Sequence, residues 1–429
     1  MRLDVDRLKK ALCIVSAAVT GLTASSCGLK FETIEESHRQ IYLPQIIDFS
    51  WWGNEIRSDY TIKGIKEYEQ TQYSVDIRPL TSDYTGYKET LDALMTCHKE
   101  PDLMTIDASW LRDYSPDGSG FCDLNDFSDI IELSNFSEQE LSYGTVNGKL
   151  NALPVSLNAM SFYYNAKLLE DYGLEVPETW DDIFACAEVL SQHDIYTLES
   201  SDRHYWKLLV AHEEQLTGRA VAGEGGFDVS NVVSMMQFYK KLLDCHVIPF
   251  VELERSDFSD KKTAGEMLWV SDAQYYTLAL EEKGGEVLVG SYPHMDMNKR
   301  FGWYVKPTSL YAISKHSDCQ RETAQFLNYL MNNSRMAELQ GIEKGVPLSK
   351  SALETLSAKS MLAGVPYQAS KKIEENAEML ELMPPQLEDL DRINCFFEYF
   401  DLFYYGRLSV EEAAYSFVRK FPFAESGTT

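Results

Sequence analysis

Two short clusters near the start of the chain combine indole rings with small polar side chains. Each cluster follows an apolar segment, and the members are Trp51, Trp52, Asn54 and Arg57 in the first, and Asp107, Ser109 and Trp110 in the second. Indole faces stack on the apolar face of a pyranose ring, and short polar side chains hydrogen-bond its hydroxyl groups. These residue types therefore predict a carbohydrate-binding site.

The adjacent pair Trp51 and Trp52 strengthens this prediction. Ordinary core packing is the alternative explanation for any single tryptophan. Neighbouring residues of an extended chain point to opposite sides, so both rings cannot enter one core. We therefore expect at least one of the two to face a cleft.

Further aromatic and polar side chains stand where strands or loops are expected to end. Trp206 begins a helical pattern after a polar loop, and Trp269 and Ser271 end a short apolar strand. Tyr163 and Tyr164 close another apolar run and point oppositely if that run is a strand. One of these two tyrosines is expected to reach the same site.

Alternating strand and helix patterns position the two clusters. Apolar strands are expected at 45–49, 74–78 and 102–106, with amphipathic helices between them. This order predicts a parallel sheet with right-handed crossovers, in which ligands bind beyond the carboxyl ends of the strands. Both clusters follow such strand ends.

The stretch 148–182 is expected to organise the whole chain. It holds Pro154 inside an apolar run that continues into a second run ending at Asn165. Proline lacks a backbone donor and is poorly suited to a central strand. We therefore predict a hinge strand that crosses between two folded bodies.

With its flanking segments, from about 46 to 417, this stretch resembles the extracellular solute-binding proteins of ABC importers, in the family 1 group that includes maltose-binding protein. The resemblance implies an α/β fold of two lobes with mainly parallel sheets, hinge strands and a ligand cleft between the lobes. It implies further crossings at 302–315 and at 341–347. The implied boundaries are 43–153 plus 309–345 for the first lobe and 154–308 plus 346–429 for the second.

The resemblance also implies a function and a set of ligand contacts. The protein would be the non-enzymatic, monomeric substrate-binding component of an ABC importer, without a cofactor, delivering an oligosaccharide to permease subunits. Family contacts fall on the two clusters named above, on Asn158 by position, and on the segment of Trp269. The complete expected set is Trp51, Trp52, Asn54, Arg57, Asp107, Ser109, Trp110, Asn158, Tyr163, Trp206, Trp269, Ser271, Trp303 and Lys306.

Arg57 and Lys306 are basic side chains expected near the cleft of an acidic protein. Surface solvation explains most such residues, whereas the functional alternative is recognition of a carboxylate in a uronic-acid-containing oligosaccharide. The segments around Trp51 and Trp110 resemble family members associated with plant-cell-wall oligosaccharides. Both alternatives stay open at the level of sequence.

The first 26 residues have the pattern of a secretory signal. A basic start is followed by an apolar stretch at 11–24, shorter than the roughly 20 residues that span a bilayer. Small residues before Cys27 resemble a lipobox, which implies lipidation of Cys27, a tether at 27–42 and a position on the extracellular face of the bacterial cell membrane. The alternative is ordinary secretion with Cys27 as a spare thiol.

Composition limits the possible classes of function. A formal net charge of −28 over 429 residues excludes nucleic acid and an anionic membrane surface as partners. The length suits two domains. The cysteines form no CxxC pair, and the acidic loop at 113–127 lacks calcium-loop spacing, so no metal is expected; one or two disulfides stay open.

Two other classes of protein remain as alternatives. A secreted glycoside hydrolase would need two carboxylates about 5 to 10 Å apart, and Glu266 and Asp272, on either side of Trp269, are the pair to test. The chain has no P-loop, GxSxG or HExxH motif. A sugar-sensing or adhesive lipoprotein on the same fold is the other alternative.

Overall fold

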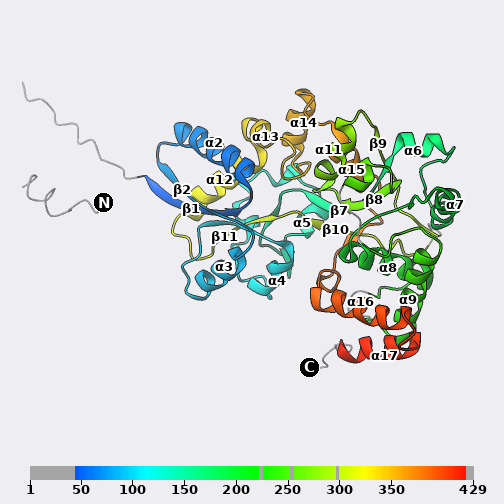
Figure 1. Cartoon of the computed structure of the whole chain (residues 1–429). Helices are drawn as coiled ribbons and strands as arrows, with labels where there is room; N and C mark the ends of the chain where they lie inside the picture. The colour runs from blue at the N-terminus through cyan, green and yellow to red at the C-terminus, as the bar shows by residue number, and fades with distance from the viewer. Residues whose placement is uncertain (1–43, 222–225, 252–255, 296–298, 422–429) are drawn as a thin grey trace, which may run out of the picture. The chain divides into compact units, whose positions relative to one another are not determined.

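The computed structural model describes residues 44–421, apart from 222–225, 252–255 and 296–298 (Figure 1). The expected signal peptide, tether and lipidated Cys27 lie outside the described residues. Within the described part of the chain, none of the helices combines the length and the apolar character needed to span a membrane.

The first sheet contains the parallel strands that the sequence predicts. β1 pairs in parallel with β2 and β3, and β11 joins β3 and β6 in antiparallel fashion. The strand order is β2 (Val75–Ser82), β1 (Gln45–Trp52), β3 (Leu103–Ile106), β11 (Leu310–Ile313) and β6 (Leu153–Pro154). A separate hairpin pairs β4 (Thr145–Val146) with β5 (Lys149–Leu150).

Helices cover both faces of the first sheet. Alternate residues of β1, Phe49 and Trp51 among them, enter a core with α2 and α12, whereas Trp52 joins a second core with Tyr87 of α3. Tyr87 also ties its helix to the sheet, because its hydroxyl lies 2.8 Å from Ser50 Oγ. The helices are α2 (Glu55–Thr71), α3 (Tyr87–Thr96), α4 (Leu111–Tyr114), α5 (Glu138–Ser142), α12 (Gln320–Asn332), α13 (Ser334–Gln340) and α14 (Lys350–Ala358).

The second sheet is built around one long strand, β7. β7 pairs in antiparallel fashion with β10, β8 and β9, and among the described strands of this sheet only β10 and β12 pair in parallel. The strands are β12 (Glu381–Leu382), β10 (Tyr304–Pro307), β7 (Leu157–Asn165), β8 (Gly265–Trp269) and β9 (Val287–Val289). The parallel arrangement is thus concentrated in the first sheet.

A large helical core packs with the second sheet. α11 and α15 contact β7 and β9, while α8, α9, α16 and α17 pack on one another. The helices are α6 (Ala166–Asp171), α7 (Trp180–Leu190), α8 (Asp202–Thr217), α9 (Val229–Asp244), α10 (Ser256–Ser259), α11 (Ala273–Glu282), α15 (Gly364–Glu375), α16 (Leu390–Tyr404) and α17 (Val410–Lys420). Short 3-10 turns are η1 (Ala108–Trp110), η2 (Leu124–Phe127), η3 (Leu133–Asn135), η4 (Ser191–His193) and η5 (Pro385–Leu387).

Two chain segments pass directly between the sheets, where the sequence places the first two crossings. The first leaves β6 through Val155 and Ser156 into β7, and the second leaves β10 through Thr308 and Ser309 into β11. The two segments are hydrogen-bonded to each other: Val155 N donates to Ser309 O at 3.1 Å, and Thr308 N donates to Ser156 O at 2.9 Å. The hinge expected at Pro154 is therefore a paired junction of two strands.

The segment 341–347 lies against this junction but does not itself change sheets. Ser156 Oγ donates to Lys344 O, and Gly345 has φ +88°, with space so limited that an added Cβ would lie 2.6 Å from Ser156 Oγ. The following helix, α14, still packs on α13 and α12. Ser349 at its start donates to Asn332 Oδ1 of α12 at 2.7 Å, which fixes α14 on the side of the first sheet.

The chain joins the second sheet only after α14, with α15. This corrects the expectation that 341–347 forms the third crossing; the lobe boundaries given above remain a prediction. The described cysteines Cys97, Cys122, Cys186, Cys245, Cys319 and Cys395 are all free thiols, so no disulfide joins them.

Candidate ligand-binding site

A cavity of about 520 Å³ lies at the junction of the two sheets. Strand ends, crossing segments and the start of α2 all contribute side chains to it. The lining residues are Trp52, Arg57, Tyr84, Thr105, Asp107, Asn158, Trp269, Ser271, Asp272, Lys306, Thr308, Ser309 and Lys344. Its position beyond the carboxyl ends of β1 and β3 is the one expected for a ligand site in such sheets.

Trp52 forms the aromatic wall on the side of the first sheet. Its ring lies 5.5 Å from Tyr84, 5.2 Å from Tyr87 and 5.5 Å from Trp110, measured between centroids. Trp110 is buried and does not line the cavity, so it supports Trp52 instead. This packing fixes the orientation of the one indole that the first sheet presents to the cavity.

Trp269 forms the corresponding wall on the side of the second sheet. Two ammonium groups lie near its ring, with Lys306 Nζ 4.9 Å and Lys207 Nζ 5.3 Å from the centroid. Burial lowers the pKa of Lys207 to about 8, with the charge of Glu388 opposing the shift and the charges of Lys306 and Arg203 adding to it. Lys306 itself is paired with Glu388 at 2.6 Å.

Asn158 and Ser271 form a polar part of the same wall. Asn158 Nδ2 donates to Ser271 Oγ at 3.0 Å, and Ser271 N donates to Asn158 Oδ1 at 3.2 Å. These two bonds connect β7 to the turn after β8. The pair therefore presents a fixed amide and hydroxyl to the cavity.

Lys344 is the most unusual group in the cavity. Its side chain is almost fully buried, and Nζ donates to the Tyr311 hydroxyl at 2.5 Å. Burial, together with the positive charge of Arg57, lowers the pKa of Lys344 to about 7. Buried lysines with such depressed pKa values are typical of functional sites. An anionic ligand placed beside the lysine stabilises its protonated, positively charged form.

The structure brings half of the expected contacts together at this cavity. They come from the clusters after β1 and β3 and from the segments of β7, β8 and β10: Trp52, Arg57, Asp107, Asn158, Trp269, Ser271 and Lys306. Their role in binding a ligand remains a proposal. Asp107 also accepts from Ser109 N at 2.9 Å, which begins the turn η1.

Four of the expected contacts are corrected, because their rings are packed in cores. Trp51 is fully buried against Phe49, and Tyr163 is fully buried within β7. Trp206 packs among the aromatic rings of α16 and α17, and Trp303 packs against Trp180 and Phe162. Period-two alternation on β1 sends Trp52 to the cavity and Trp51 to the core.

The remaining expected contacts lie beside the cavity without lining it. Asn54 is the N-cap of α2 and accepts from Arg57 N at 3.0 Å. Ser109 lines a neighbouring cavity of about 440 Å³ that shares Lys306 with the first. Glu266, half of the possible hydrolase pair, is buried in β8, and only Asp272 lines the site cavity.

Sequence reasoning missed several lining residues as ligand contacts. Thr308, Ser309 and Lys344 belong to segments expected to be crossings, and Tyr84 and Thr105 follow or end strands of the first sheet. The available signal for Lys344 was a lysine directly before Gly345 in an expected crossing segment. Its burial follows only from the packing of that segment on Ser156 and Tyr311.

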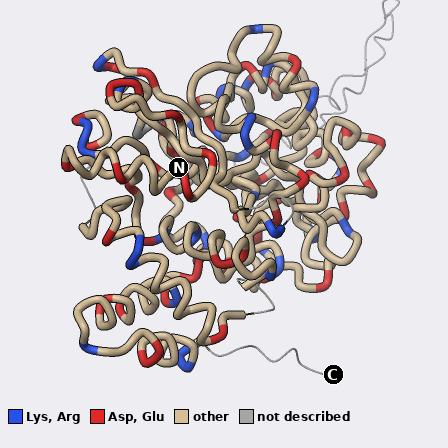
Figure 2. The backbone as a smooth tube through the Cα atoms, turned by 90° about the vertical axis from the view of Figure 1, so that its right-hand side faces the viewer, with Lys and Arg blue, Asp and Glu red and all other residues tan. Residues whose placement is uncertain are grey.

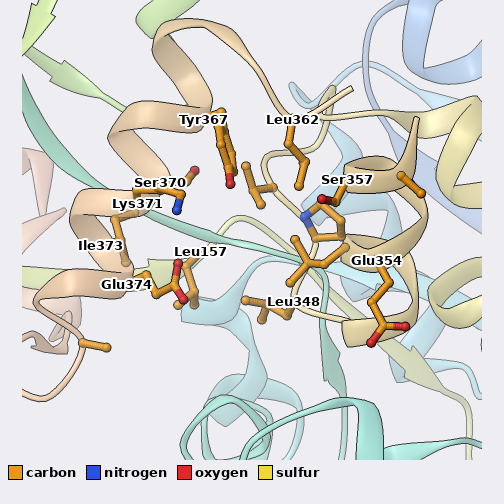
Figure 3. Close-up of a pocket in the computed structure, with 15 residues that line it drawn as sticks. Leu157, Leu348, Glu354, Ser357, Leu362, Tyr367, Ser370, Lys371, Ile373 and Glu374 are labelled. Carbon is orange, nitrogen blue, oxygen red and sulfur yellow. The ribbon is translucent and has the colours of Figure 1, made fainter. Parts of the chain in front are cut away.

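A further cavity, of about 630 Å³, lies on the other face of β7 (Figure 3). Leu157 lines it, whereas the next residue of the strand, Asn158, lines the site cavity. Ser357 of α14 and Tyr367 of α15 face each other across this rear cavity. Because α14 packs with the first sheet and α15 with the second, the rear cavity separates helices of the two sheets.

The charges of the site contrast with those of the whole chain. Acidic residues are spread along the described backbone, in keeping with the net charge of −28 (Figure 2). The cavity nevertheless gathers Arg57, Lys306 and Lys344, against Asp107 and Asp272. Lys306 is paired with Glu388. Arg57 and Lys344 are therefore the cations of this cavity that are best placed to attract an anionic ligand.

Comparisons with known proteins agree with this architecture. A curated relative, an uncharacterised ABC transporter extracellular-binding protein of Pyrococcus horikoshii, is 22% identical over 261 residues, and the chain spans 58% of that relative's length. A periplasmic solute binding protein from Pectobacterium atrosepticum is 26% identical with a TM-score of 0.78, covering 88% of this chain and 97% of that one.

Two further solved structures are similar over the same extent. A de novo designed cysteine esterase is 26% identical, with a TM-score of 0.79 and coverage of 88% of this chain and 97% of that one. A periplasmic oligogalacturonide binding protein from Yersinia enterocolitica is 26% identical with a TM-score of 0.75, covering 88% and 98%, and was also solved with saturated digalacturonic acid.

The architecture and these similarities define the fold and the class of protein. The chain has the two-lobe α/β fold of periplasmic solute-binding proteins, and the Pectobacterium and Yersinia neighbours are binding proteins. The family model described as bacterial extracellular solute-binding protein matches residues 63–373. The chain belongs to the family of bacterial extracellular solute-binding proteins.

Proposed function

We propose that this protein captures an acidic, uronic-acid-containing oligosaccharide outside the cell and delivers it to the permease of an ABC importer. One observation carries the proposal: Arg57, Lys306 and Lys344 line the same cavity as the indoles of Trp52 and Trp269. Indole rings suit sugar faces, and cationic groups suit sugar carboxylates. The Yersinia oligogalacturonide binding protein supports the same choice of ligand.

Each cation has a distinct role in this proposal. Arg57 supplies a planar guanidinium for bidentate contact with a carboxylate, and its Nη2 donates to Glu343 O at 3.4 Å. Lys344 is nearly buried, so a carboxylate beside it replaces the water that the ammonium lost on folding. Lys306 lines both the site cavity and the neighbouring cavity that contains Ser109. A longer oligosaccharide can therefore extend from the first cavity into the second.

Isothermal titration calorimetry against two disaccharides tests the proposal. We expect digalacturonic acid to bind with a Kd of about 1 μM or tighter, equivalent to about −8 kcal/mol. Maltose, which lacks carboxylates, should bind at least about a hundredfold more weakly. Tighter binding of maltose, or no binding of either sugar, would contradict the acidic ligand.

The same samples also distinguish a binding function from a glycoside hydrolase activity. Chromatography of the digalacturonic acid after prolonged incubation should recover the intact disaccharide. Release of monosaccharide at a steady rate would instead favour the hydrolase, with Asp107 and Asp272 as the carboxylates that line the cavity.

The proposal includes closure of the two sheet bodies around the ligand by bending at the paired junction. Binding energy then shifts the population toward the closed form, which the permease recognises. Lipidation of Cys27 and a flexible tether at 27–42 would hold the protein at the membrane. A sensing or adhesive role would use the same site without a permease partner.

Ser357→Trp tests the bending motion from the rear cavity. Closing the site cavity should widen the space between α14 and α15, so a bulky ring placed there opposes the open form. We expect the affinity for digalacturonic acid to rise by up to about tenfold, because the ligand no longer supplies all of the closing free energy. Calorimetry on the variant measures this change.

Ser357→Ala is the matched control, since it removes the same hydroxyl without filling the cavity. Its affinity should equal that of the wild type. An unchanged or weakened affinity of Ser357→Trp, with the fold intact, would show that the rear cavity does not open when ligand binds.

A further inference from the structure

A cluster of metal-binding side chains lies at the end of the first sheet opposite the sugar cavity. His98, Glu100 and His316 each offer one ligand atom, and these atoms all lie within 4.8 Å of one another. Glu100 precedes β3 and His316 follows β11. These two strands pair in antiparallel fashion, so the two residues meet at the same end of the strand pair. Thr105 and Asp107 line the site cavity of about 520 Å³ from the other end of β3.

Local structure holds the three side chains in place. His98 follows the last turn of α3 with φ +52°, the left-handed conformation common after a helix end. Ser314 N donates to Asp102 O at 2.9 Å, and Ser314 Oγ donates to Glu100 Oε1 at 2.7 Å. His316 N in turn donates to Ser314 Oγ at 3.0 Å. Ser314 therefore fixes both the carboxylate and the backbone of the second histidine.

The carboxylate of Glu100 is not satisfied by these contacts. Its side chain is only 1% exposed, and His316 Nδ1 donates to Oε1 at 2.7 Å. Oε2 is buried and has no hydrogen-bond partner among the described residues. A buried carboxylate oxygen without a hydrogen-bond partner destabilises the folded protein, and a bound cation would remove this destabilisation.

The histidine rings are arranged around the same carboxylate. The ring centroids of His98 and His316 lie 4.3 Å apart, and both side chains are exposed enough to turn. Zn²⁺ holds imidazole nitrogens and carboxylate oxygens at about 2.0 to 2.2 Å, so tetrahedral ligands stand about 3.3 Å apart. A rotation of the two exposed rings brings the three atoms to that spacing.

We propose that His98, Glu100 and His316 bind one divalent first-row transition metal ion of the Zn²⁺ type. Two imidazoles and one carboxylate suit Zn²⁺, Co²⁺ and Ni²⁺, whereas Ca²⁺ and Mg²⁺ prefer all-oxygen sites. The ion joins the loop after α3 to the loop after β11 and leaves room for water as a further ligand. It acts on the stability of the first sheet and takes no part in sugar binding.

Metal titration of the intact protein tests this site. Isothermal titration calorimetry with ZnCl₂ should give one site per chain with a Kd in the micromolar range or tighter, and MgCl₂ should give no comparable binding. Zn²⁺ should also raise the Tm, because it binds the folded form. The affinity for digalacturonic acid should stay the same with and without Zn²⁺.

Variants assign the site to the three residues. His98→Ala and His316→Ala each remove one exposed ligand and should weaken Zn²⁺ binding at least about tenfold without loss of fold. Glu100→Gln should weaken binding as well, although its burial makes it the variant most prone to unfold. His193→Ala, at an exposed histidine of η4 elsewhere on the chain, should leave Zn²⁺ binding unchanged.

Two results would overturn the proposal. One is a Zn²⁺ affinity of His98→Ala and His316→Ala equal to that of the wild type, which would assign binding to other surface groups. The other is the absence of one-to-one binding by the wild-type protein below about 1 mM Zn²⁺. In that case the His316–Glu100 contact is only a hydrogen bond between two loops.

Discussion

Lys344→Gln is expected to weaken the binding of digalacturonic acid at pH 6 by at least about thirtyfold. Removing one partner of a buried, hydrogen-bonded charge pair costs about 2 to 5 kcal/mol, and thirtyfold is the lower end of that range. Glutamine keeps much of the length of lysine and can still hydrogen-bond Tyr311, so the loss reports the charge. Calorimetry on the variant and the wild type measures it.

The same lysine should make binding depend on pH. The pKa of Lys344 is lowered to about 7 in the free protein, by burial and by Arg57. Burial raises the pKa of Tyr311, which therefore stays neutral beside it. A bound carboxylate favours the protonated lysine, so affinity should be greatest below pH 7 and fall by at most about tenfold for each pH unit above 7.

Stability should follow the opposite trend. The unfolded chain binds a proton at Lys344 up to its ordinary pKa of 10.5, whereas the folded chain releases it from about pH 7. Between these values the unfolded state binds more protons, so this lysine makes the free energy of unfolding rise with pH. Urea denaturation at pH 7 and pH 9 should show a rise in the wild type that is smaller in Lys344→Gln, where the lowered pKa of Lys207 still contributes to it.

Lys66→Gln is the matched control, since Lys66 is an exposed lysine of α2, the helix that carries Arg57. It should leave both affinity and pH dependence unchanged. If Lys344→Gln binds digalacturonic acid as tightly as the wild type at pH 6, the carboxylate does not contact this lysine and the electrostatic part of the proposal is wrong.

Trp269→Ala is expected to weaken binding of the same ligand by roughly 1 to 3 kcal/mol with little loss of fold. The indole lines the cavity, and the ammonium groups of Lys207 and Lys306 lie near its ring. Its removal loses the sugar-stacking face and leaves both cations without their aromatic neighbour. Calorimetry measures the affinity, and thermal unfolding shows that the fold persists.

Trp51→Ala provides the contrast, because Trp51 is fully buried and lies 4.8 Å from Phe49 between ring centroids. Its loss should lower the free energy of unfolding by about 3 to 5 kcal/mol, as for other large core deletions. The molecules of this variant that remain folded should bind the sugar with the affinity of the wild type. The reverse pattern, with Trp51 needed for affinity and Trp269 for stability, would place the site elsewhere.

Local sequence patterns predicted the elements of the fold well. The strands around 45–49, 74–78 and 102–106 form the parallel part of the first sheet, and the crossings near Pro154 and Pro307 join the two sheets. Such elements follow from hydrophobic periodicity and proline placement, which act over a few residues. The segment 341–347 was misplaced as a crossing, because Ser349 and Asn332 hold α14 through a contact between distant residues.

By itself, the sequence determined that indoles and polar groups follow strand ends and that Trp51 and Trp52 cannot share one core. Alternation along the strand sends the two rings to opposite faces without saying which of them lines the cavity. Tertiary packing alone decided that Trp52 and Trp269 share one cavity while Trp51, Trp206 and Trp303 are buried. It also gave Lys344 its burial and lowered pKa, because desolvation depends on what distant segments place around a charge.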